Sequence, residues 1–199
     1  MKSEVIVIND GNTEEALELT ERFTNEFSPK SALRIRLIAE ETMNLVRAIA
    51  GDMDAQYWLE KEDDICKIHL NTNTVMFAQK RKELLEVSTK KENAAARGVL
   101  GKVREVFELA LLPKDERTAR ESKVGMMGLV DPTSLSATTN TETWKMSSYV
   151  NAVNDMEPNE FAQEARNELE RSILGNLAKD VTIAIVGDDV KMTIEYVLD

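Results

Sequence analysis

Apolar residues recur at helical spacing between Leu33 and Gly51 and predict a helix with two distinct faces. At about 100° per residue, one side of this helix collects the apolar side chains of Ile35, Ile38, Leu45, Val46 and Ile49. The polar side chains of Glu40, Asn44 and Arg47 fall in a narrow stripe on the opposite side. The pattern therefore predicts a core face and a polar face on one helix.

The polar stripe of this helix brings two oxygen-bearing side chains together, because residues four apart in a helix are neighbours on its surface. The carboxylate of Glu40 can take a proton from water, and the amide oxygen of Asn44 is a suitable ligand for Mg²⁺. The alternative is a half-solvated helix face with a chance Glu/Asn pair, since the pattern is short. Leu33 and Leu37 share the stripe, so we expect it to face another part of the protein as well as water.

Segments on either side of this helix predict an α/β protein. Runs rich in Val, Ile and aromatic residues predict strands, and clusters of turn-forming residues separate them. The predicted strands are Glu4–Ile8, Ala55–Glu60, Ile65–Thr72, Val181–Val186 and Val190–Val197. Further helices are predicted at Thr13–Phe27 and Asn159–Ala178. The second and third strands form one hairpin, and the last two strands form another.

The order of these segments predicts one domain with a two-layer α/β sandwich fold. We expect a mixed, mostly antiparallel sheet of about five strands with helices on one face. A chain of 199 residues suffices for one well-buried core. Residues 74–176 are expected to form a mostly helical insertion. Within it, residues 113–143 form a long polar segment of the kind found in lids, partner-binding loops and disordered regions.

Charge and hydropathy limit the classes of partner. The formal net charge is −11 and the pI is about 4.8, which opposes binding to nucleic acid or to an anionic membrane. No apolar run reaches the roughly 18 residues needed for a membrane span. The first residues contain too short an apolar segment for a signal peptide. We therefore expect a cytoplasmic, bacterial-style protein.

The single cysteine and the single histidine lie on the same predicted strand. Cys66 has no second cysteine for an intrachain disulfide, and the alternation along the strand places it on the core side. His69 falls on the other side, where we favour a surface histidine over a phosphoacceptor or a general base. One histidine and one cysteine do not make a zinc site.

The order of elements, with Glu40-Glu41-Thr42-Met43-Asn44 late in its helix, resembles a known ATP-binding domain. This is the GHKL, or Bergerat, fold of gyrase B subunits, sensor histidine kinases and anti-sigma-factor serine kinases, and the small anti-sigma-factor type is the nearest likeness. The resemblance covers roughly residues 1–75 and 177–199. It implies that Asn44 holds Mg²⁺ beside the ATP phosphates and that Glu40 positions the attacking water. Arg47, on the same stripe, is a further candidate for cofactor binding.

Two other parts of the family's nucleotide site have weaker counterparts in this chain. In the family, a glycine-rich lid leads into a helix whose N-terminus meets the phosphates. Here Gly98 and Gly101 stand near the start of a predicted helix, where close helix packing is the alternative explanation. The relatives also follow the second hairpin strand with Asp-x-Gly-x-Gly, whose carboxylate reads adenine. This chain has Asn71-Thr72-Asn73-Thr74-Val75, so Asn71 and Asn73 are the remaining candidates for the base.

The resemblance implies a regulatory protein with a histidine kinase-like fold, with ATP and Mg²⁺ as candidate ligands, which acts through protein partners like an anti-sigma factor. The alternative is a non-catalytic descendant of that fold that binds no nucleotide and serves as a protein-interaction or dimerisation module. An active ATPase or serine/threonine kinase is the third hypothesis, and the missing Asp-x-Gly-x-Gly argues against it. A protein partner is expected, a homodimer is possible in principle, and nucleic acid and membranes are not expected.

Overall fold

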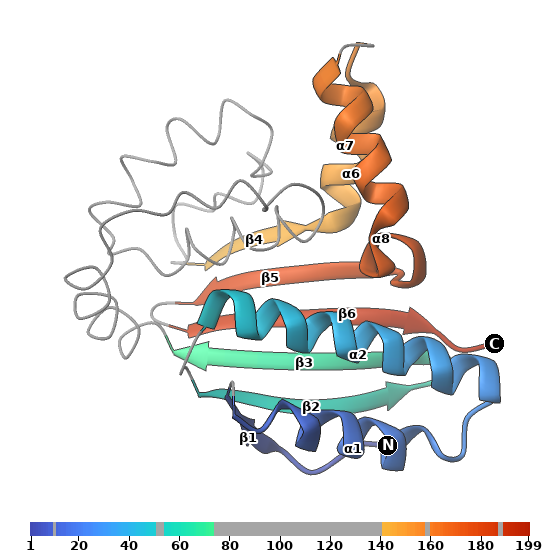
Figure 1. Cartoon of the computed structure of the whole chain (residues 1–199), viewed down its shortest axis with the longest axis vertical. Coiled ribbons are helices and arrows are strands. Elements are labelled where there is room, and N and C mark those ends of the chain that lie inside the picture. The colour runs from blue at the N-terminus through green and yellow to red at the C-terminus, as the bar shows by residue number, and fades with distance from the viewer. Residues whose placement is uncertain (10, 51–53, 74–140, 158–159, 187–188) are drawn as a thin grey trace.

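A computed structural model shows one antiparallel sheet covered by helices (Figure 1). The structure describes residues 1–9, 11–50, 54–73, 141–157, 160–186 and 189–199. The sheet has six strands in the order β1-β2-β3-β6-β5-β4, and every neighbouring pair is antiparallel. The strands are β1 (Ile6–Ile8), β2 (Ala55–Glu62), β3 (Ile65–Asn73), β4 (Thr141–Lys145), β5 (Asp180–Val186) and β6 (Asp189–Val197).

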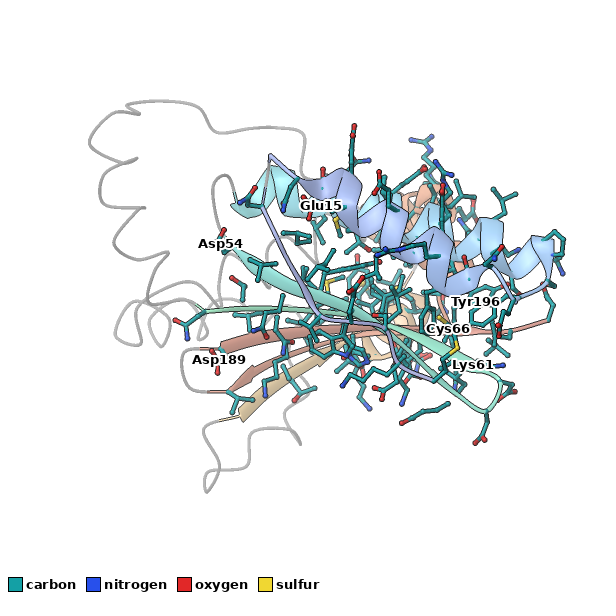
Figure 2. The ribbon with its side chains drawn as sticks, turned by 90° about the horizontal axis from the view of Figure 1, so that it is seen from below. Glu15, Asp54, Lys61, Cys66, Asp189 and Tyr196 are labelled. Atoms are coloured by element: carbon teal, nitrogen blue, oxygen red, sulfur yellow. The ribbon has the colours of Figure 1, made fainter. Side chains whose placement is uncertain are left out.

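Helices form the second layer. Those described are α1 (Thr13–Thr24), α2 (Pro29–Ala50), α6 (Met146–Asp155), α7 (Glu160–Arg171) and α8 (Ile173–Leu177). Helices α1 and α2 lie over one face of the sheet, and α6, α7 and α8 stand beside β4 and β5 (Figures 1 and 2). Helix α8 contacts α2. This arrangement confirms the predicted α/β sandwich with helices on one face. No helix in the described ranges is long and apolar enough to span a bilayer.

Alternation along the strands determines which side chains enter the core. On β3 the residues Cys66, Ile68 and Leu70 are 1–3% exposed and face the helices. Their neighbours along the strand point to the other side, which we call the open face of the sheet. Tyr57 of β2 is fully buried on the helix side, and its hydroxyl lies 2.7 Å from Oγ1 of Thr20 in α1. Cys66 is thus a core residue, as predicted.

Two features of the sheet and its helices differ from the prediction. The sheet gains a sixth strand, β4, inside the range expected to be mostly helical, because Trp144 pairs with Ile183 and buries its ring on the helix side. The helix predicted at Asn159–Ala178 is divided into α7 and α8 at Ser172, whose hydroxyl accepts a hydrogen bond from the amide of Gly175. A serine that caps a new helix ends the preceding one.

The outer edge of β1 is closed by a side chain. The amide of Asn12 donates to the carbonyl of Val7 at 3.0 Å, and its oxygen accepts from the backbone amide of Asn9 at 2.7 Å. These two contacts occupy one carbonyl and one amide at the end of β1, as a neighbouring strand would at that position. An edge whose backbone groups are already paired is a poor template for a strand of another chain.

Candidate functional site

The predicted site helix, α2, turns its apolar side chains toward the sheet and its polar stripe outward. Ile35 and Ile38 are fully buried. Leu33 and Asn44, on the stripe, are exposed, with Leu33 58% exposed. The core face of α2 therefore agrees with the predicted one as far as Leu45, the last residue of the helix whose side chain is described. We expected the stripe to face another part of the protein as well as water. At Leu33 it faces solvent.

Glu40 is part of an ion-pair chain between the two long helices. Its carboxylate accepts a hydrogen bond from Nε of Arg36 at 3.0 Å, one turn earlier in α2. Arg36 also pairs with Glu21 of α1. The side chains of Arg36 and Glu40 are 46% and 39% exposed, so the pair contributes only about 0.3–0.5 kcal/mol. Glu40 is thus accessible, and its first partner is an arginine of its own helix.

Asn44 follows Glu40 by one turn of α2 and is exposed, so the two residues are neighbours on the helix surface, while the Glu40 carboxylate is bonded to Arg36 on the preceding turn. The other predicted cofactor-binding residues do not join them in the described structure. The backbone of Arg47 belongs to α2, but its side chain is outside the described set. Gly98 and Gly101 lie outside the described residues.

The predicted adenine-binding residues lie on the opposite side of the sheet from α2. Asn71 and Asn73 belong to the open face, and Nδ2 of Asn73 donates to Oδ1 of Asp189 at 2.7 Å. The side chain between them, Thr72, turns toward the helices, is 7% exposed, and donates to the backbone oxygen of Asp54 at 3.1 Å. The sheet therefore separates the two asparagines from the polar stripe of α2.

The orientation of Thr72 could have been read from the sequence. Cys66, Ile68 and Leu70 alternate as core residues, and continuing that period by one step places Thr72 on the core side. The end of β3 and the C-terminal end of α2 lie at the same end of the molecule (Figure 1). At this end of β3, Thr72 is therefore the polar side chain that points toward the helix layer, which contains Glu40.

Sequence reasoning missed Glu41, the buried neighbour of Glu40. Its side chain points into the molecule and is 8% exposed. One carboxylate oxygen accepts from the backbone amide of Leu174 at 2.6 Å, and the other lies 3.4 Å from the hydroxyl of Ser172. Burial raises the pKa of Glu41 above its ordinary value, and these hydrogen bonds oppose the rise. Glu41 attaches α8 to α2 and is a structural carboxylate.

A second group of polar side chains lies on the open face. The rings of Trp58 and His69 are stacked, with centroids 4.7 Å apart, and Nζ of Lys2 lies 5.4 Å from the Trp58 ring centroid. Nδ1 of His69 lies 3.2 Å from Oγ1 of Thr193, and its Nε2 lies 3.5 Å from a Glu60 oxygen, too far for a good hydrogen bond. Burial lowers the pKa of His69.

The His69 group is better suited to structure than to catalysis. The hydroxyl that His69 contacts is that of Thr193, at Nδ1, and within the described residues Nε2 has no hydrogen-bond partner that could orient the ring as a general base. The described part of the chain also contains no group of three His, Cys, Asp or Glu side chains that could hold a metal ion. Both rings are engaged, since Trp58 has His69 stacked on it and Lys2 close to it. His69 lies on the predicted side of its strand, opposite Cys66, but its side chain is only 15% exposed, so it is more buried than the predicted surface histidine.

A cleft of about 470 Å³ lies between the first four residues and α1. Leu19 and Phe23 line it, and they are only 4% and 7% exposed. The ion pair of Arg22 with Glu4, at 2.7 Å, lies at the same cleft. A ligand would bury little apolar surface of Leu19 and Phe23, so these side chains offer only a weak hydrophobic contribution to binding.

Comparisons of the chain with protein-family models, with curated proteins and with solved structures found no match.

Proposed function

We propose that this protein is a regulatory module on a histidine kinase-like sandwich that acts by binding other protein molecules and does not depend on a bound nucleotide. The observation that supports this proposal is the division of the predicted nucleotide site by the sheet. Glu40 and Asn44 lie on the outer side of the helix layer, and Asn71 and Asn73 lie on the open face. Groups on opposite faces of a sheet cannot contact one small ligand together.

The described residues suit the metal-binding part of an ATP·Mg²⁺ site but not its adenine-binding part. The oxygens of Glu40 and Asn44 are of the kind that Mg²⁺ takes, and Mg²⁺ usually needs only one or two protein carboxylates beside substrate phosphates. Asn71 and Asn73 do not suit the adenine base in the same site, because they project from the far side of β3. Binding of ATP·Mg²⁺ through Glu40 and Asn44 is therefore the second candidate function, favoured by their adjacency.

Thermal unfolding with and without nucleotide separates these two functions. A ligand present at about 100 times its dissociation constant adds roughly 2.7 kcal/mol of stability. We expect no change in the unfolding midpoint on addition of Mg²⁺ with millimolar ATP or ADP. A midpoint that rises in the wild type but not in Asn44→Ala would contradict the proposal and support the second candidate. Asn151→Ala, an exposed asparagine on α6, is the matched control and should behave as the wild type.

A further inference from the structure

We propose that the open face of the sheet is a self-association surface, on which a second copy of this chain packs across a two-fold axis. The axis runs across the strands along the row of Trp58, His69 and Thr193, which are paired neighbours on β2, β3 and β6. This inference rests on the proposed function, because it names the protein partner. It concerns the face of the sheet opposite α1 and α2 (Figure 2).

The open face is large enough for a stable contact. Strands lie about 4.8 Å apart and rise about 3.3 Å per residue, so six strands of these lengths span on the order of 600 Å² before the relief of side chains is added. Standard interfaces bury about 600 to 1,000 Å² on each partner, so the area of this face reaches the lower end of that range. Sheets that pack face to face keep their strands within about 30° of one another. A second sheet could therefore cover most of the face.

The charges on β6 match those of a second copy. Lys191 and Glu195 stand two residues to either side of Thr193, so all three side chains are on the open face. A two-fold axis through Thr193 and across the strands exchanges these two positions. Lys191 of each copy then faces Glu195 of the other, which gives two opposite-charge contacts. With packed sheets about 10 Å apart, both side chains are long enough to meet.

The same axis brings compatible groups together on the neighbouring strands. Asn71 on β3 then faces Lys67 of the second copy, and Gln56 on β2 faces Glu60 of the second copy. An amide can accept from an ammonium group or donate to a carboxylate. No like charges meet at these positions, which lie two residues to either side of the axis. Further out, Glu62 of β2 faces Asp54 of the second copy, and Lys145 of β4, paired with Thr182 on the axial row, faces its own copy, so the match is confined to the centre of the face.

Two other surfaces are poorer places for two copies to meet. Helix α1 exposes Glu14, Glu15, Glu18 and Glu21, with Arg22 as its one exposed base, so two such helices would repel each other. The edge of β1 is closed by Asn12, as described above. On a chain with a net charge of −11, the mixed charges of the open face favour self-association over these alternatives.

Sedimentation equilibrium of the full chain tests this surface. The wild type should sediment as a dimer of 22.4 kDa subunits at micromolar concentration. Lys191→Glu alone and Glu195→Lys alone each set like charges against each other at both contacts, and each should raise the dimer dissociation constant about tenfold or more. The double variant K191E/E195K restores opposite charges and should restore the dimer. Circular dichroism checks that every variant is folded.

The control for this experiment is Glu18→Lys, a charge reversal on the exposed face of α1, which should leave the dimer unchanged. A wild type that is monomeric at all concentrations would overturn the inference, and so would a dimer that both single reversals leave intact. Neither result bears on the nucleotide experiment. Conversely, a nucleotide shift that depends on Asn44 would contradict the proposed function and leave the dimer measurement standing.

Discussion

Glu41 is buried and hydrogen-bonded to another helix, whereas the adjacent Glu40 is not. Glu40 is on the outside of α2, whereas Glu41 points inward to the start of α8. A buried carboxylate costs free energy through desolvation, and its acceptance of the Leu174 amide offsets part of that cost. Because the pKa of Glu41 is raised in the folded state, folding takes up protons in the window above about 4.5.

The contribution of Glu41 to stability should therefore be greatest at acid pH and fall as the pH rises through the raised pKa. Glu41→Gln keeps an acceptor for the Leu174 amide and removes the titration. We expect this variant to lie within about 1 kcal/mol of the wild type at pH 7 and to lose stability relative to it at pH 5. Urea unfolding at both pH values measures the difference.

A matched variant separates the charge of Glu41 from its hydrogen bonds. Glu41→Leu leaves the amide of Leu174 and the hydroxyl of Ser172 without their acceptor and should cost about 1–3 kcal/mol at pH 7. A stability difference between the wild type and Glu41→Gln that does not change from pH 7 to pH 5 would show that Glu41 does not titrate in this window.

His69 responds to pH in the opposite direction. Its pKa is lowered, first by burial, so the folded state favours the neutral ring and stability should fall as the pH drops below about 6.5. The nearby Glu60 opposes this shift and Lys67 adds to it. We expect Glu60→Gln to lower the pKa of His69 further and Lys67→Met to raise it.

His69 is the only histidine in the chain, so its ring protons give one titration curve by NMR. The expected midpoint in the wild type is below 6.5. A midpoint at or above 6.5 would contradict the dominant effect of burial on this ring, and a midpoint that Glu60→Gln leaves in place would contradict the electrostatic effect of Glu60.

At the scale of elements, the junction between α7 and α8 depends on one glycine. A Cβ added at Gly175 would lie 2.7 Å from the backbone oxygen of Leu169 and 3.4 Å from Cβ of Ser172. The first distance is far below van der Waals contact, and a backbone oxygen cannot move away as a flexible side chain can. The glycine is therefore required for space at this junction.

Gly175→Ala should consequently destabilise the protein by about 1–3 kcal/mol, the usual cost of overpacking. Gly11→Ala is the control, because the described atom that a Cβ there would meet is Oδ1 of Asn9, at 3.4 Å, and the change in stability should be less than about 0.5 kcal/mol. Urea unfolding of the two variants side by side makes the comparison. Equal effects at the two sites would mean that α8 can shift to accept the methyl group.

The sequence predicts most of the helices and strands correctly, but it does not predict strand β4. The Val- and Ile-rich runs of β5 and β6 and the alternation in β3 predict strands without any tertiary information. Strand β4, Thr-Glu-Thr-Trp-Lys, is too short and too polar to be predicted from the sequence. It is a strand because it pairs with β5. The break at Ser172 was similarly hidden, because the apolar residues on either side of it keep helical spacing.

At the scale of the whole molecule, the pairing of β3 with β6 joins two local hairpins into one sheet. Ile68 and Ile194, far apart in the chain, are partners in this pairing, and both are buried against the helices. The result is one continuous core face and one open face. The self-association proposed above belongs to this scale, since residues of three strands must be in register before the surface exists.

Residues close together in the chain were enough to specify the local features of this protein. Period and composition specify the amphipathic α2, the two hairpins, the core position of Cys66 and the outward position of Glu40 and Asn44, because each depends only on residues near it in the chain. Which of these residues come into contact depends on the tertiary fold. Asn71 and Asn73 are separated from Asn44 by the sheet, and Glu41 meets Ser172 across 131 positions of sequence, because strand order and helix docking depend on long-range packing that no local pattern encodes.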